Sequence, residues 1–178
     1  MDLVKQQIET HSDFPQKGIL FRDIMPVFRH PEAYSALLDE LQSRVSSLAP
    51  NCAGLIGIES RGFLLASPLA LRMKLPFVPA RKSGKLPGSV CKKSFDKEYG
   101  QDVIEIQQAS LEKGKAYVIL DDLLATGGTL KAVCDLVKDC GASVAAGIVV
   151  IELTGLPGRQ LVEAGGNKVE TLLAMPSC

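Results

Sequence analysis

Short apolar runs alternate with helical patterns along most of the chain. Residues 53–58 form an apolar run as long as one buried strand, a helical pattern covers residues 63–73, and a second apolar run lies at 76–80. The same order returns further along, in the apolar run 116–120, the helical pattern 128–138 and the apolar run 142–151. This strand, helix, strand order predicts a parallel sheet with helices on its faces. We therefore expect an α/β fold.

The N-terminal part predicts two helices around a turn-rich segment. Val4 and Ile8 are spaced for a short amphipathic helix, and a turn-rich stretch with apolar anchors covers residues 13–24. After Pro31, the apolar residues follow one face of a helix: Tyr34, Leu37, Leu38, Leu41, Val45 and Leu48. We expect that helix to face the core.

The composition favours one globular domain spanning residues 1–178. Hydrophobic residues make up 46% and charged residues 22%, which excludes a disordered chain. Lysine plus arginine equal aspartate plus glutamate at 20 each, so no overall field would hold nucleic acid or an anionic membrane. The N-terminus lacks the basic start and apolar run of a signal peptide, and the longest apolar stretch, residues 144–151, is far shorter than a bilayer span. We expect a cytoplasmic protein without nucleic-acid or membrane partners.

The cysteines and histidines give no sign of a metal site or a catalytic triad. The five cysteines form no Cys-x-x-Cys pair and no histidine stands at metal-ligand spacing from them, so we expect reduced thiols. They are Cys52, Cys91, Cys134, Cys140 and Cys178. Only His11 and His30 are present, neither beside a nucleophile motif, which disfavours a histidine-based triad.

The most informative stretch is residues 118–129, an apolar run that ends in Asp121 and Asp122. Ligands bind at the carboxyl edge of strands in open α/β sheets. Two adjacent carboxylates are costly to place together unless they face donors or a cation. A ribose diol near a magnesium ion supplies both, whereas the plain alternative is a pair of solvent-facing aspartates.

A turn of small residues, 125–129, follows the two acids and opens the next helical pattern. Its backbone N–H groups and the helix N-terminus can surround one phosphate, with Gly127 and Gly128 permitting close approach. Thr126 and Thr129 add hydroxyl donors, although a turn that merely caps a helix would need the same residue types. Neither the nucleoside-triphosphatase nor the dinucleotide glycine motif follows any apolar run, which disfavours both classes.

Three other segments carry chemistry-bearing residues, each with a plain alternative. The polar turn at 59–62 could simply connect a strand to a helix, and residues 14–24 could form a packed turn. Residues 81–100 are basic, long and without a helical pattern, which favours a functional lid over a solvated surface loop.

Together these segments resemble the type I phosphoribosyltransferase family over nearly the whole chain. Residues 121–129 resemble its phosphoribosyl pyrophosphate signature, and Leu-Leu-Ala-Thr-Gly-Gly-Thr at 123–129 is the form typical of members that act on adenine. Residues 14–24, 59–63, 81–88 and 98–100 resemble further segments of those members. The resemblance implies a central, mostly parallel sheet flanked by helices, a small N-terminal hood at about residues 1–30 and a mobile lid loop at about 82–100.

The resemblance also implies a role for each segment. The ribose and 5-phosphate would be bound by Asp121, Asp122, Ala125, Thr126, Gly127, Gly128 and Thr129. Pyrophosphate would be bound by Glu59, Ser60, Arg61, Arg81, Lys82 and Lys85. Adenine would lie against Leu20, Phe21 and Arg22, with Glu98 and Arg61 as catalytic residues. Relatives often carry Asp where this chain has Glu59, and their pyrophosphate turn implies a cis peptide between Glu59 and Ser60 here.

The implied reaction converts adenine and 5-phosphoribosyl 1-pyrophosphate to AMP and pyrophosphate, a step of purine salvage. Mg²⁺ would be held mainly by the substrate, with Asp121 and Asp122 nearby and no dedicated protein ligands. The resemblance implies a homodimer. Two alternatives stay open: a phosphoribosyltransferase with another purine preference, and a non-catalytic regulator that senses phosphoribosyl pyrophosphate.

Overall fold

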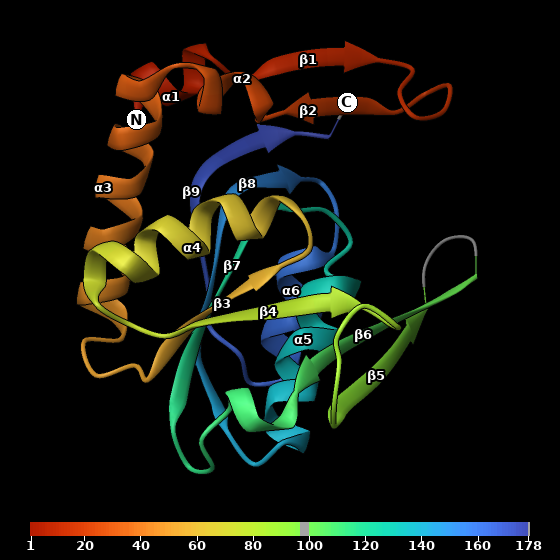
Figure 1. The fold of residues 1–178 in the computed structure, drawn as a ribbon. Helices are drawn as coiled ribbons and strands as arrows, with labels where there is room; N and C mark the ends of the chain where they lie inside the picture. Colours follow the sequence, from red (N-terminus) through yellow and green to blue (C-terminus); the bar gives the residue numbers. More distant parts are fainter. Residues whose placement is uncertain (97–99, 178) are drawn as a thin grey trace.

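The computed structural model describes residues 1–96 and 100–177 (Figure 1). Within these residues a seven-stranded sheet has the order β5-β6-β4-β3-β7-β8-β9, and β1 and β2 form a separate hairpin. The strands are β1 (Glu9–Ser12), β2 (Leu20–Asp23), β3 (Gly54–Ile58), β4 (Phe77–Lys82), β5 (Val90–Asp96), β6 (Gln101–Gln107), β7 (Ala116–Leu124), β8 (Ser143–Thr154) and β9 (Val169–Pro176). The helices are α1 (Asp2–Gln6), α2 (Met25–Arg29), α3 (Pro31–Leu48), α4 (Arg61–Met73), α5 (Gly128–Asp139) and α6 (Gly158–Ala164), with a 3₁₀ turn at Gln108–Ser110.

The large sheet is mostly parallel, which confirms the expected α/β fold. β4, β3, β7, β8 and β9 pair in parallel. β6 joins β4 in antiparallel register, and β5 joins β6 in the same way. All five residues of β3 are buried, as expected for a central strand covered on both faces.

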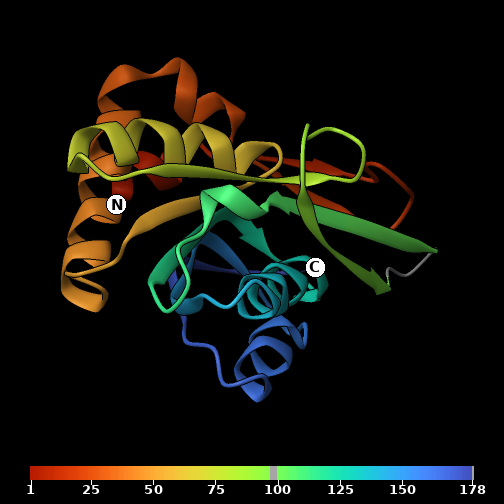
Figure 2. The same cartoon turned by 60° about the horizontal axis from the view of Figure 1, so that its bottom comes forward.

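Two hydrophobic cores lie on opposite faces of the sheet. Leu55 of β3 and Val118 of β7 belong to the core under α3 and α4, whereas the next residues, Ile56 and Ile119, belong to the core under α5. Alternation of side chains along each strand produces this division. Figure 2 shows α4 in yellow and α5 in cyan on opposite sides of the central strands. No helix among the described residues is long and apolar enough to cross a bilayer.

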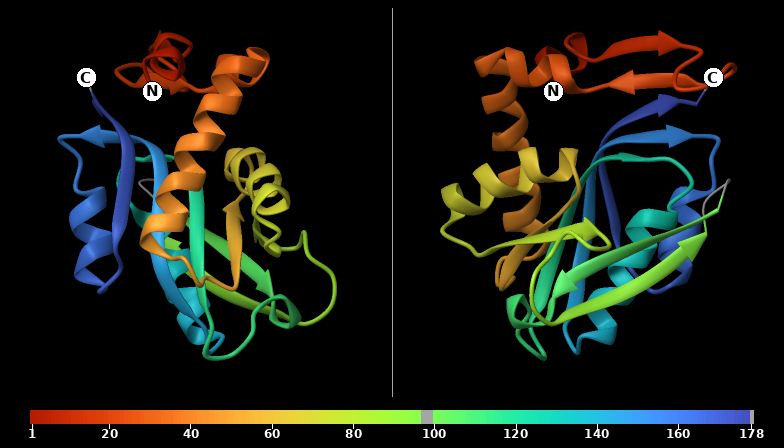
Figure 3. Two further views of the ribbon diagram at one scale, coloured as in Figure 1. Left: turned by 90° about the vertical axis from the view of Figure 1, so that its left-hand side faces the viewer. Right: turned by 45° about the vertical axis from the view of Figure 1, so that its right-hand side comes forward.

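The N-terminal hairpin lies beside the end of the C-terminal strand. Both views in Figure 3 place β1 and β2 next to the end of β9. Arg22 of β2 donates to the carbonyl oxygen of Pro176 at 2.9 Å and to Thr10 Oγ1 at 2.7 Å. The segment expected as a hood therefore consists of α1, β1, β2 and α2, joined to the main sheet through Arg22.

Part of the lid loop expected at about 82–100 is a strand. Lys82 ends β4, residues 90–96 form β5, and only residues 83–89 connect the two strands. β5 was missed because its inward positions include Lys93, whose amine pairs with Asp139 of α5 at 2.8 Å. A strand with lysine at an inward position does not show the usual alternation of apolar and polar residues. Residues 97–99, including Glu98, lie outside the described residues.

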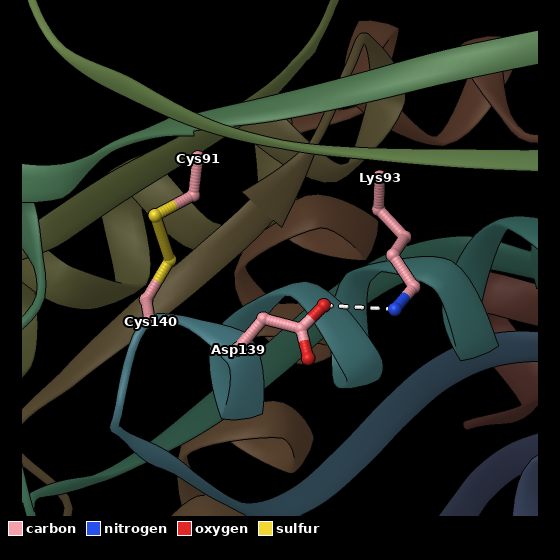
Figure 4. Close-up of a disulfide and its surroundings, with 4 residues drawn as sticks. All are labelled: Cys91, Lys93, Asp139 and Cys140. Carbon is pink, nitrogen blue, oxygen red and sulfur yellow. Dashed lines mark hydrogen bonds and ion pairs between the residues drawn. A yellow bond between two sulfur atoms is a disulfide. The ribbon is translucent and has the colours of Figure 1, made fainter.

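The expectation of reduced thiols is also wrong at two positions. Cys91 of β5 and Cys140, which follows α5, are joined by a disulfide (Figure 4). Their Cα atoms lie 6.6 Å apart, within the range that a disulfide spans. The two cysteines stand 49 residues apart in sequence, so only the packing of β5 against α5 brings them together. Cys52 and Cys134 are free and buried.

The contact between α4 and β7 generates the first prediction. A Cβ on Gly62, in the first turn of α4, would lie 2.5 Å from the carbonyl oxygen of Leu120. Gly62→Ala should therefore lower the free energy of unfolding by about 1–3 kcal/mol, because the helix must shift away from the strand. Urea unfolding followed by circular dichroism measures this change. Ser67→Ala, on the exposed side of the same helix, is the control; equal stabilities of the two variants would contradict the prediction.

Candidate active site

A cavity of about 510 Å³ opens at the carboxyl ends of β3, β4 and β7. It brings together all seven residues predicted to bind the ribose and 5-phosphate. Of the residues predicted to bind pyrophosphate it includes Glu59, Ser60, Arg61, Lys82 and Lys85. Arg81 lies behind this lining, in contact with Glu59. One cavity therefore unites segments that are up to 70 residues apart, from Glu59 to Thr129.

The turn between β7 and α5 forms the part of the cavity predicted to hold phosphate. Gly127 is the N-cap of α5 and has φ 84°, a conformation that favours glycine. The first turn of a helix has backbone N–H groups without intrahelical partners, and here they adjoin the cavity. An anion is stabilised at such a position by these N–H groups and by the helix dipole.

The start of α6 supports this turn from behind. A Cβ on Gly127 would lie 2.6 Å from the carbonyl oxygen of Gly158, and a Cβ on Gly158 would lie 2.1 Å from that of Ala125. Neither glycine can therefore accept a side chain without movement of the backbone. Gly158 was not predicted from the sequence, since a single glycine after a turn gives no sign of which segment it contacts.

The sequence pattern placed Asp121 and Asp122 at the carboxyl end of a strand, and β7 continues past them to Leu124. Asp122 is only 3% exposed and accepts a hydrogen bond from Arg61 Nε, so it does not face solvent. Its backbone N–H donates to Asp121 Oδ1 at 2.9 Å. Burial, followed by the charge of Asp122, holds the pKa of the Asp121 carboxyl well above its usual range. A ligand hydroxyl or a cation at Asp121 would favour its ionised form.

Glu59 gathers the cations predicted to bind pyrophosphate. The Glu59–Ser60 peptide is cis, as predicted. The Glu59 carboxylate accepts hydrogen bonds from Arg81 Nε at 3.2 Å, from the backbone N–H of Lys82 at 3.1 Å and from Lys85 Nζ. Burial opposes ionisation of Glu59, but the hydrogen bonds from Lys85, Arg81 and Lys82 outweigh it and lower its pKa. The carboxylate is thus a negative charge held among positive groups.

The residues predicted to bind adenine lie beside the cavity lining. Leu20, Phe21 and Arg22 form β2. The Arg61 guanidinium lies 5.7 Å from the centre of the Phe21 ring, so the same arginine contacts both the hairpin and Asp122. Phe14 packs edge-on against Phe21 with ring centroids 5.0 Å apart. Glu98, the predicted catalytic acid, lies outside the described residues.

The matching family and relatives agree with this arrangement. The profile of the family described as phosphoribosyl transferase domain matches residues 33–160. An adenine phosphoribosyltransferase of Caenorhabditis elegans is 44% identical over 162 residues, which cover 89% of this chain and 88% of that protein. One of Carboxydothermus hydrogenoformans is 44% identical over 173 residues, covering 97% of this chain and 99% of that protein.

Solved structures of such enzymes share the fold. The adenine phosphoribosyltransferase of Saccharomyces cerevisiae, complexed with a dideoxy-imino-altritol bisphosphate and adenine, has a TM-score of 0.92 and 38% identity, with 97% of each chain covered. That of Trypanosoma brucei, in complex with AMP, pyrophosphate and ribose-5-phosphate, has a TM-score of 0.87 and 28% identity, covering 98% of this chain and 80% of that one. With the cavity, its two acids and its phosphate turn, these matches establish that the chain belongs to the phosphoribosyltransferase family, among the adenine phosphoribosyltransferases.

Proposed function

We propose that this chain transfers the phosphoribosyl group of 5-phosphoribosyl 1-pyrophosphate to adenine, forming AMP and releasing pyrophosphate in purine salvage. The observation that carries the proposal is the meeting of three features in one cavity: an acid pair, a helix N-terminus and a turn surrounded by cations. The substrate has a diol between two phosphate groups, so each feature has a partner. The curated relatives are adenine phosphoribosyltransferases, which favours this activity over a different purine preference or a regulator without catalysis.

Catalysis would rest on positioning and on the placement of charge. The N–H groups of residues 126–129 would hold the 5-phosphate, and Asp121 and Asp122 would accept hydrogen bonds from the ribose hydroxyls. Arg61, Lys82 and Lys85 would then turn toward the departing pyrophosphate. Positive charge that develops on the ribose would lie near the two carboxylates, which stabilise it.

The acid pair also fits a magnesium ion held mainly by the substrate. Magnesium prefers oxygen ligands and is usually bound by only one or two carboxylates of a protein. Asp121 offers a carboxyl with a raised pKa, which a bound cation would lower. When bound, the ion would neutralise charge on the pyrophosphate. Asp121 would orient the ribose at the same time.

The base would bind between the N-terminal hairpin and the cavity. Phe21 would lie against the purine ring, and backbone groups of Leu20 and Arg22 would read its edge. Arg61, which already lies over the Phe21 ring, would connect the base to the pyrophosphate turn. Glu98 would handle the purine proton.

Two copies of the chain would form a homodimer through the outer face of α4, in the cytoplasm. Leu64 and Leu71 on this helix are 39% and 83% exposed, and a largely apolar hollow lies between the helix and Phe77. A second copy would remove this apolar surface from water. The cavity at the acid pair would stay open to substrate.

The base preference tests the proposed function most directly. Adenine offers its 6-amino group to a backbone carbonyl and accepts at the neighbouring ring nitrogen, whereas hypoxanthine and guanine reverse both partners. Sites that leave buried polar groups unpaired in this way discriminate by about 10⁴-fold. We expect that ratio in kcat/KM between adenine and hypoxanthine. Comparable turnover of the two bases would overturn the assignment.

Asp121→Asn should impair use of the sugar substrate. The substitution removes a charged hydrogen-bond acceptor. We therefore expect a decrease of about 10- to 100-fold in kcat/KM for phosphoribosyl pyrophosphate. Asp139→Asn, at the far end of α5, is the control, since its carboxylate pairs with Lys93 away from the cavity. Thermal unfolding of both variants separates stability from catalysis. Unchanged kinetics in Asp121→Asn would remove Asp121 from the ribose site.

The dimer is tested by Leu71→Glu. A buried charge in the proposed interface should shift the sedimentation of the chain at micromolar concentration from dimer to monomer. Leu161→Glu, an equivalent change at a 40% exposed leucine on α6, should leave the dimer intact. A wild-type chain that sediments as a monomer at every concentration would refute the homodimer.

A further inference from the structure

Glu105 of β6 is a buried acid to which no role has been given so far. It is 1% exposed, although it lies on a strand near the edge of the sheet. Its neighbours Ile104 and Ile106 belong to the core under α5. Because side chains alternate along a strand, Glu105 points to the opposite face, where residues 83–89 cover it.

The Glu105 carboxylate holds the connection between β4 and β5. Its Oε1 accepts hydrogen bonds from the backbone N–H groups of Lys85 and Leu86, both at 2.9 Å. Its Oε2 lies 3.4 Å from Lys92 Nζ. Burial alone would raise the pKa of the Glu105 carboxyl, but the hydrogen bonds that it accepts lower it. The carboxylate therefore stays ionised and fixes the backbone at Lys85.

The fixed backbone directs the Lys85 side chain into the cavity. Lys85 Nζ donates to the Glu59 carboxylate, and the carbonyl oxygen of Lys85 accepts from Arg81 at 3.2 Å. Two of the cations at the Glu59 turn thus depend on the position of one residue. Glu105 does not itself line the cavity, so its replacement would act on the lining through the connection that it holds.

We propose that Glu105 is a positioning residue for pyrophosphate: by holding the backbone of Lys85, it places the Lys85 amine where it meets the pyrophosphate group of the substrate. This rests on the proposed function only in assigning the Glu59 side of the cavity to pyrophosphate. The residue itself contacts no substrate. If Glu105 had only a structural role, its replacement would lower the stability or the active fraction of the protein without a specific effect on one substrate.

The test compares Glu105→Gln with wild type in both directions of the reaction. One amide oxygen cannot replace two carboxylate oxygens, so KM should rise about tenfold for phosphoribosyl pyrophosphate and for pyrophosphate. KM for adenine and AMP should change by less than about twofold, within the scatter of independent sites. Glu40→Gln on α3 is the control, since that acid pairs with Arg44 away from the cavity. An equal change in KM for all four reactants would overturn the proposal.

A double-mutant cycle shows whether Glu105 acts through Lys85. In the Lys85→Ala background, Glu105→Gln should add less than about twofold to KM for pyrophosphate, because coupled residues are not additive. A further tenfold rise in KM for pyrophosphate would show that Glu105 does not act through Lys85.

A second pair of variants covers the case in which Glu105→Gln folds poorly. Gly84 and Gly114 both have positive φ, at 85° and 73°, and open space around them. Alanine strains both turns equally, yet only Gly84 lies in the connection held by Glu105. Gly84→Ala should raise KM for pyrophosphate and Gly114→Ala should not; equal effects would count against the proposal.

Calorimetric titration with magnesium pyrophosphate keeps the two proposals distinguishable. A wild-type chain without turnover of adenine would refute the proposed function. Pyrophosphate binding by that chain, weakened about tenfold in Glu105→Gln, would still support the positioning role. Binding that is equal in the two chains would overturn that role, whatever the turnover.

Discussion

The site depends on the parallel pairing of β3 with β7. Leu55 is paired with Val118 and Gly57 with Leu120, so the two strands reach the same edge of the sheet at matching positions. The turn after β3 therefore lies next to Asp121 and Asp122, and Arg61 at the start of α4 reaches Asp122 directly. Gly62 permits this approach, because α4 could not lie so close to β7 with a side chain there. A shift of one residue would separate the pyrophosphate turn from the acids.

Within this frame, acids of the protein hold its cations. Asp122 pairs with Arg61, Glu59 with Arg81 and Lys85, and Glu105 with the backbone at Lys85. The positive groups are therefore in place before any substrate enters, although an isolated cluster of cations would repel itself. Groups oriented in advance cost little reorganisation during the reaction, which is how enzymes obtain most electrostatic stabilisation. Each cation would exchange a carboxylate of the protein for an oxygen of the substrate.

Those features that one contiguous stretch encodes could be predicted from the sequence. The strand, acid pair and glycine turn of residues 118–129 required no distant partner, and the parallel sheet followed from the alternation of elements. The cis peptide after Glu59 came from the family resemblance alone. Features created by distant packing were missed: β5, the disulfide of Cys91 with Cys140, and the contact of Gly158 with Ala125. The burial of Glu105 was not predicted either, because the sequence gives no sign that residues 83–89 fold over it.

A crystal structure of the chain with AMP, pyrophosphate and magnesium would show whether the cavity binds the substrate groups as proposed. We expect the 5-phosphate at the N-terminus of α5, on the backbone N–H groups of residues 126–129, and the ribose hydroxyls on Asp121 and Asp122. We also expect Lys85 Nζ to leave Glu59 for a pyrophosphate oxygen, while the hydrogen bonds from Lys85 and Leu86 to Glu105 persist. Phosphate groups bound away from α5, or a Lys85 amine still on Glu59 with pyrophosphate in the cavity, would refute these assignments.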